Sequence, residues 1–250
     1  MQHLAAYYES LITTGVLTKI SAVPDQAIFT SDDDVRVPSG MANLIAEAGL
    51  SGGGTATYAQ VQSPSLRQLA NQDVDPIALA VKFSVENQLQ WHGDNPRSLQ
   101  ASESVNFTIN SNDSVAAANY GLIWLSDGAV SPTRGRIFTV RATAAAALVA
   151  GTWVNAAVVF DTSLPAGTYQ VVGFRAESAN LVAARIVFIG AAFRPGVIGD
   201  TGPSTNLMPY ARNGNMGVFG QFNVDQPPTV DFLGVTDAAE VVVFDLIKSA

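Results

Sequence analysis

The 250 residues are enough for one large domain or two modest ones, each with a buried core. Only 14% of the residues are charged, the formal net charge is −8, and the 13 Lys and Arg are spread without a basic run. This pattern excludes nucleic-acid packaging by a clustered basic face, and the absence of cysteine excludes disulfides and thiolate metal sites. No apolar run approaches the roughly 20 residues that span a bilayer.

A one-sided apolar pattern opens the chain. The residues that follow the i, i+3, i+4, i+7, i+8 spacing of an amphipathic helix are Leu4, Tyr7, Tyr8, Leu11 and Ile12. We expect a helix that ends near Gly15. Its polar face has no Lys or Arg, which disfavours a membrane surface as the binding partner. The apolar stripe is therefore predicted to contact protein, either a neighbouring subunit or the chain's own domain.

Negative charge is concentrated in one run, Asp32, Asp33 and Asp34. Hard cations bind several carboxylate and carbonyl oxygens, so this run is a candidate Ca²⁺ site, for example between subunits. Consecutive Asp side chains point in different directions, however, and the spacing of an EF-hand is absent. A solvated turn is the alternative.

Two further short helices are predicted before residue 76. Ser39 is a candidate N-cap for residues 39–48, with Gly49 just past the end, and Ser63-Pro64 opens the next helix. A short strand is expected at 27–30. Residues 1–75 are thus predicted to be an arm of short helices and extended links.

From Ile77 the apolar period changes to two, as in β-strands. The predicted strands are 80–85, 105–110, 120–125, 136–142, 153–160, 168–175, 182–190, 218–224, 230–234 and 240–247. No helical pattern alternates with them, so residues 76–250 are predicted to form one antiparallel β-sandwich or barrel. Residues 152–189 are apolar on both strand faces, which must be covered by the chain itself or by a neighbour. The Gly- and Pro-rich connection 194–215 is expected to be exposed and to make contacts.

No set of residues predicts an enzyme. Residues 49–53 match G-x-S-x-G around Ser51, but the nucleophile elbow needs a helix after the serine, and flexible glycines follow here. A hydrolase would have to join Ser51 to His92 and to Asp73 or Asp75. With two histidines in the chain, a three-histidine metal site is excluded.

The three tryptophans allow a sugar-binding platform if Trp91, Trp124 and Trp153 share a face. Trp124 and Trp153 lie inside strand patterns, which favours core packing for these two.

A helical arm over 1–75 followed by an all-β block with few charges over 76–250 resembles the viral jelly-roll coat proteins. That family has no invariant motif, so no residue role carries over. The resemblance implies an all-β, antiparallel jelly-roll-type sandwich with an N-terminal arm of short helices. It also implies a structural capsid subunit of a bacterial or archaeal virus, located in the virion. Its partners would be copies of itself, in trimers or a larger shell, and other virion proteins.

Ten predicted strands favour a single roll over a double one. No cofactor is expected apart from Ca²⁺. The alternative function is a carbohydrate-binding module or adhesin that uses Trp91, and a hydrolase that uses Ser51 is the third hypothesis.

Overall fold

The structure is a computed structural model of the chain, and it describes residues 2–13, 15–25, 30–68, 72–78, 90–112, 116–178, 180–199, 211–235 and 240–249. The chain divides into two compact units. We call Ala5–Ala129 the N-terminal unit, and Val130–Ala250 together with Met1–Leu4 the C-terminal unit. The boundary that the sequence predicted, between residues 75 and 76, falls inside the N-terminal unit.

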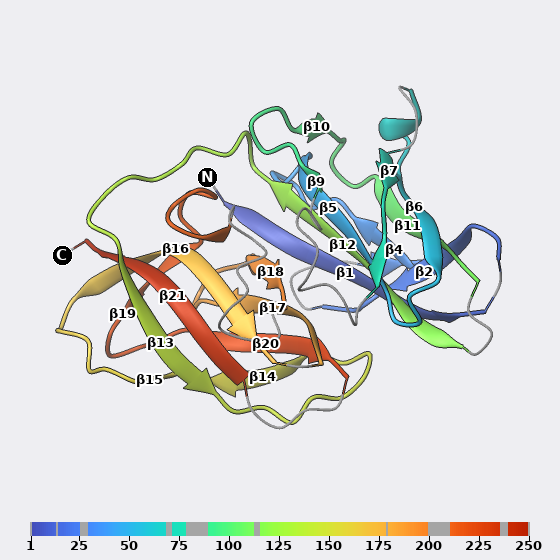
Figure 1. The fold of residues 1–250 in the computed structure, drawn as a ribbon. Coiled ribbons are helices and arrows are strands. Elements are labelled where there is room, and N and C mark those ends of the chain that lie inside the picture. Colours follow the sequence, from blue (N-terminus) through green and yellow to red (C-terminus); the bar gives the residue numbers. More distant parts are fainter. Residues whose placement is uncertain are drawn as a thin grey trace. The chain divides into compact units, whose positions relative to one another are not determined.

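The N-terminal unit is built on one twelve-stranded sheet (Figure 1). Its strands are β1 (His3–Ile12), β2 (Thr18–Ala22), β3 (Thr30–Ser31), β4 (Asp34–Arg36), β5 (Asn43–Ser51), β6 (Ala56–Gln62), β7 (Gln72–Val74), β8 (Ile77–Ala78), β9 (Gln90–Trp91), β10 (Arg97–Ser98), β11 (Ser104–Ser111) and β12 (Ala117–Ser126). The main path runs β10-β5-β12-β1-β2-β11-β4-β3; β6 pairs with β11 and β7, and β8 and β9 pair with β5. The β5–β8 pairing is parallel.

The predicted arm of short helices is wrong. Residues 3–12 form strand β1, in which Tyr8 lies opposite Ala22 of β2 and donates a 2.6 Å hydrogen bond to the Val105 carbonyl. Ala5 and Ala6 are buried together with Leu4, Tyr7 and Tyr8. A strand covered on both faces explains this consecutive burial, whereas a one-stripe helix would expose those alanines.

The second predicted helix is also a strand. Residues 43–51 form β5, which is buried from Leu44 to Ser51 and pairs with β12 along most of its length. The third is reduced to a short 3-10 turn, η1 (Leu66–Gln68), where Ser63 Oγ accepts a 3.1 Å hydrogen bond from the Leu66 amide. The strand predicted at 27–30 falls mostly outside the described residues, as does all of 80–85.

The C-terminal unit is an antiparallel β-sandwich (Figure 1). Its strands are β13 (Phe138–Ala144), β14 (Val154–Ala157), β15 (Val159–Phe160), β16 (Thr168–Glu177), β17 (Leu181–Val187), β18 (Gly196–Ile198), β19 (Gly220–Asn223), β20 (Thr229–Gly234) and β21 (Glu240–Lys248). A five-stranded sheet has the order β15-β13-β21-β16-β19, and a four-stranded sheet the order β14-β20-β17-β18. The sequence prediction of an all-β antiparallel sandwich is confirmed.

Consecutive residues are buried in β16 (171–174) and in β17 (181–186), so the chain itself covers both faces of these two strands, whereas Val159 of β15 is 67% exposed. Segment 211–217 lies against the five-stranded sheet, where Arg212 pairs with Asp245 of β21 and the Gly214 amide donates a 2.8 Å hydrogen bond to the Val172 carbonyl of β16. Phe174 of β16 packs against Phe244 of β21, with ring centroids 5.2 Å apart. Among the described residues, no helix is long and apolar enough to cross a membrane.

Candidate functional site

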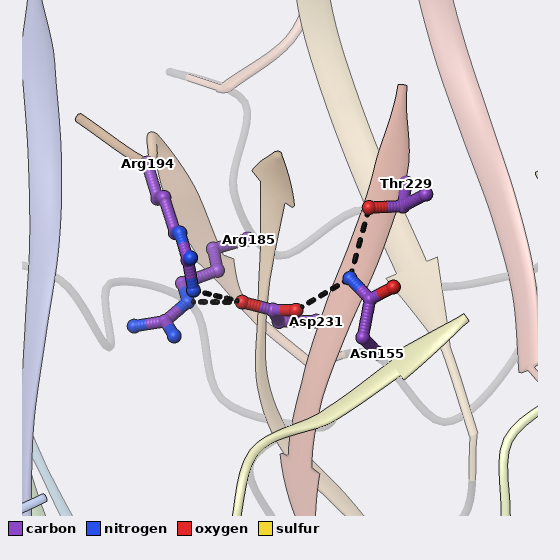
Figure 2. A network of polar contacts seen from close by, with 5 residues as sticks. All are labelled: Asn155, Arg185, Arg194, Thr229 and Asp231. Carbon is purple, nitrogen blue, oxygen red and sulfur yellow. Dashed lines mark hydrogen bonds and ion pairs between the residues drawn. The ribbon is translucent and has the colours of Figure 1, made fainter. Parts of the chain in front are cut away.

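A row of polar side chains crosses the four-stranded sheet of the C-terminal unit (Figure 2). Strand β20 lies between β14 and β17, and the register places Asn155 and Arg185 on either side of Asp231. Directly opposed residues of neighbouring strands point to the same face, so the three side chains meet. Asp231 Oδ2 accepts from Arg185 Nε at 2.9 Å and from Arg194 Nη1 at 2.7 Å, while Oδ1 accepts from Asn155 Nδ2 at 2.7 Å.

This polar network is buried at its centre. Arg185 and Asp231 are both buried, and the Trp153 ring covers the guanidinium, whose Cζ lies 3.8 Å from the ring centroid. Arg194 belongs to the connection between β17 and β18, so its hydrogen bond ties that connection to the sheet. The three donors on this one carboxylate come from β14, from β17 and from the connection after β17. The geometry is that of a structural clamp.

A second network fixes segment 211–217 to the five-stranded sheet. Arg212 donates to both oxygens of Asp245, Nε to Oδ2 at 2.7 Å and Nη2 to Oδ1 at 2.9 Å. The Asn213 amide and the Thr139 hydroxyl also donate to this carboxylate, at 2.8 and 2.7 Å. Burial by itself would raise the pKa of Asp245, but these hydrogen bonds outweigh it and hold the pKa below the usual value. This ion pair is structural as well.

In the N-terminal unit, His92 pairs with a buried carboxyl group and not with the serine of the G-x-S-x-G pattern. His92 Nε2 lies 3.0 Å from Glu47 Oε2, and burial raises the pKa of Glu47 although His92 partly offsets the rise. Ser51 Oγ accepts hydrogen bonds from the Gly54 and Ala56 amides, at 3.1 and 3.2 Å. The serine therefore stabilises the turn after β5, and the described contacts do not join it to His92.

Asp32 and Asp33 form the turn between β3 and β4, and Asp34 is the first residue of β4. Asp32 and Asp33 have φ angles of 53° and 68°, the left-handed values that a tight hairpin turn requires. Lys19 Nζ lies 2.6 Å from Asp34 Oδ1 and donates a 2.5 Å hydrogen bond to the Asp32 carbonyl. Among the described residues no group of three or more His, Cys, Asp or Glu side chains gathers as a metal site. Calcium binding here stays a prediction that titration with Ca²⁺ can test.

The predicted contact residues of β1 divide into two classes. Leu4, Tyr7, Tyr8 and Ile12 are buried within the chain, whereas Leu11 is 70% exposed. Val16 and Leu17, in the connection from β1 to β2, are 63% and 38% exposed. We call Leu11, Val16 and Leu17 the apolar tip. A role of the five predicted residues in subunit contacts stays a prediction.

The tryptophans are placed differently from one another. Trp91 of β9 and Trp124 of β12 both lie opposite Ala46 of β5, which puts them on one face of the sheet. Trp124 is fully buried, as its strand pattern predicted, and Trp91 is half-buried. Trp153 is half-buried against Arg185.

A groove of about 740 Å³ opens on the C-terminal unit, and we call it the uncharged groove. Its walls come from the β16–β19 pair and from the segment that follows β17. No Asp, Glu, Lys or Arg is among its described lining residues. The residues on which its chemistry depends are His3, Gln170, Phe188, Ile189, Phe219 and Gln221.

The histidine of this groove is almost completely buried. His3 is 2% exposed, and its ring meets Phe219 edge-to-face with centroids 4.7 Å apart. Burial lowers its pKa to about 4, so the imidazole is neutral at pH 7. Neither Nδ1 nor Nε2 has a hydrogen-bond partner among the described residues.

Sequence reasoning missed both the clamp around Asp231 and the uncharged groove. The clamp does leave a signal, because Arg185 and Asp231 are single charges inside otherwise apolar strand runs. A charged side chain in a strand that is covered on both faces is expected to form an ion pair with an oppositely charged side chain. The groove leaves no comparable signal, since it joins residue 3 to segments near 170, 190 and 220.

No protein-family model matches the chain, and no curated protein matches it either. Among solved structures, the major capsid protein P2 from bacteriophage PM2 aligns over 99% of this chain and 98% of its own, with 10% sequence identity and a TM-score of 0.23. A Paenibacillus xanthan lyase aligns over 96% of this chain and 25% of its own, with 12% identity and a TM-score of 0.23. TM-scores of 0.23 support no inference about the function of this chain. The function proposed below rests on the chain's own residues.

Proposed function

We propose that this chain is a structural subunit of a viral coat, which self-assembles with its own copies into a symmetric shell. Each of its two units would contribute β-sheet to the shell. A double version of the jelly-roll coat subunit therefore fits better than the single roll that the number of predicted strands favoured. The proposal places the chain in the virion, with other virion proteins as further partners.

The observation that carries the proposal is how the chain distributes charge and apolar surface. Charged residues make up 14% of the chain, well below the roughly 25% of an ordinary soluble domain. Of the 13 cationic residues, Arg185 and Arg212 are buried in ion pairs with Asp231 and Asp245. The remaining surface is therefore poor in the charges that keep a free monomer soluble.

Large aliphatic side chains project from this weakly charged surface. Single exposed aliphatic residues are normal, but a group of them marks an interaction site. Leu11, Val16 and Leu17 are all exposed within seven consecutive residues of the N-terminal unit. On the C-terminal unit, Ile189 is 73% exposed and lines the uncharged groove. Burial of such groups against other copies would stabilise an assembly with few ion pairs.

The test is the mass and symmetry of the purified chain at neutral pH. Sedimentation velocity over a hundredfold range of concentration should show one discrete oligomer or shell, and negative-stain electron microscopy should show particles of uniform shape. A monomer at the highest concentration would refute the proposal. Amorphous aggregates without a defined mass would also count against it.

A further inference from the structure

The residues that line the uncharged groove favour a neutral occupant over a charged one. Because no described lining residue is charged, the groove offers no counter-ion to a charged ligand. Gln170 and Gln221 lie directly opposite each other in the β16–β19 register and present amide donors and acceptors. Ile189 and Ala191 provide an exposed aliphatic rim. These features suit a neutral peptide segment with aliphatic side chains.

His3 adds a second, independent observation. A buried polar group without a hydrogen bond destabilises the folded chain, and native proteins normally pair such groups. The neutral imidazole has one donor and one acceptor nitrogen, and a peptide group has the matching carbonyl and N–H. The imidazole lines the groove but both of its nitrogens are buried, so the main-chain groups of an occupant can supply the missing partner only once neighbouring side chains move aside.

The chain carries a segment of the required kind in its other unit. Residues 11–17 contain no charged side chain, and Leu11, Val16 and Leu17 are exposed. Leu11 lies near the end of β1, and Val16 and Leu17 come just before β2, which pairs antiparallel with β1. Its neutral, aliphatic character matches the rim and walls of the groove.

We propose that the apolar tip of one copy binds the uncharged groove of a second copy. This inference rests on the proposed self-assembly and names the contact that drives it. The two surfaces are different, so the interface is heterologous, and each copy can both give a tip and receive one. Heterologous contacts can close into rings or continue through a shell. A self-complementary patch, by contrast, joins two copies and is then fully used.

The experiment uses two full-length variants that each carry one added charge at an exposed position. Leu11→Asp disables the tip, and Ile189→Asp disables the groove. Because both side chains are largely exposed, folding should be retained, and circular dichroism and thermal unfolding check this. Val159→Asp is the matched control, an equally exposed aliphatic residue of the same unit that does not line the groove.

Sedimentation velocity should show Leu11→Asp and Ile189→Asp as monomers under conditions where the native chain and Val159→Asp assemble. A 1:1 mixture of the two disabled variants should then form heterodimers and nothing larger, because one intact tip and one intact groove remain per pair. Native-like assembly of either variant, or a mixture that stays monomeric, overturns the inference. If the native chain itself never assembles, the proposed coat function fails instead.

Discussion

Replacement of Asp231 by asparagine removes the charge at the centre of the clamp while keeping its shape. Three hydrogen bonds end on this carboxylate, two of them from the guanidinium groups of Arg185 and Arg194. Removal of one partner from a buried ion pair typically costs about 3 to 5 kcal/mol. Asparagine keeps one acceptor oxygen, so Asp231→Asn should reduce the free energy of unfolding of the C-terminal unit by about 3 kcal/mol.

Urea denaturation followed by tryptophan fluorescence measures this loss, because Trp153 lies on the Arg185 guanidinium and reports on the clamp. Asp161→Asn is the control. Asp161 pairs with Arg141 at 3.7 Å on the exposed surface of the same unit, where an ion pair contributes about 0 to 1 kcal/mol. Equal effects of the two substitutions would refute the reasoning that burial makes the Asp231 pair important. A loss below about 1 kcal/mol for Asp231→Asn would do the same.

The remaining predictions concern pH and packing. His3 has an unfolded pKa of 6.5 and a folded pKa of about 4, so its protonation favours the unfolded chain as the pH falls from 6.5 toward 4. At about 1.4 kcal/mol per pKa unit, the native chain should lose about 3 kcal/mol more stability over this window than His3→Phe, as urea midpoints at each pH will show. Equal losses in both would contradict the buried neutral imidazole. Gly121→Ala should destabilise the N-terminal unit by about 1 to 3 kcal/mol, because the new Cβ would lie 2.3 Å from the buried Phe107 ring. Gly128→Ala, which meets nothing within 4 Å, should change stability by less than about 0.5 kcal/mol; similar melting temperatures for the two variants would contradict the packing argument.

The period-two pattern predicted most of the C-terminal unit correctly. Strands expected at 168–175 and 230–234 were found at Thr168–Glu177 and Thr229–Gly234. Alternation and turn residues are local properties, and here the long-range pairing agreed with them. The low charge is also a property of composition, and the proposal of self-assembly depends on it.

The first 51 residues show where local pattern failed. Residues 3–12 fit a helix by spacing, but Tyr8 reaches the Val105 carbonyl 97 residues away, and β1 takes its place inside a twelve-stranded sheet. Long-range pairing and burial on both faces override a helical spacing of this length. The same holds for β5, whose partner β12 lies about 75 residues further on.

The sequence by itself thus determined the all-β class, the sparse charge and most strands after residue 104. The tertiary structure decided which charges meet and which apolar residues stay outside. Asp231 meets Arg185 through the register of β17 and β20, and Leu11 is exposed while its neighbour Ile12 is buried. Both depend on how distant strands align, and a shift of register by one residue would reverse them. That alignment is a sum over many weak long-range contacts, which no single stretch of sequence specifies.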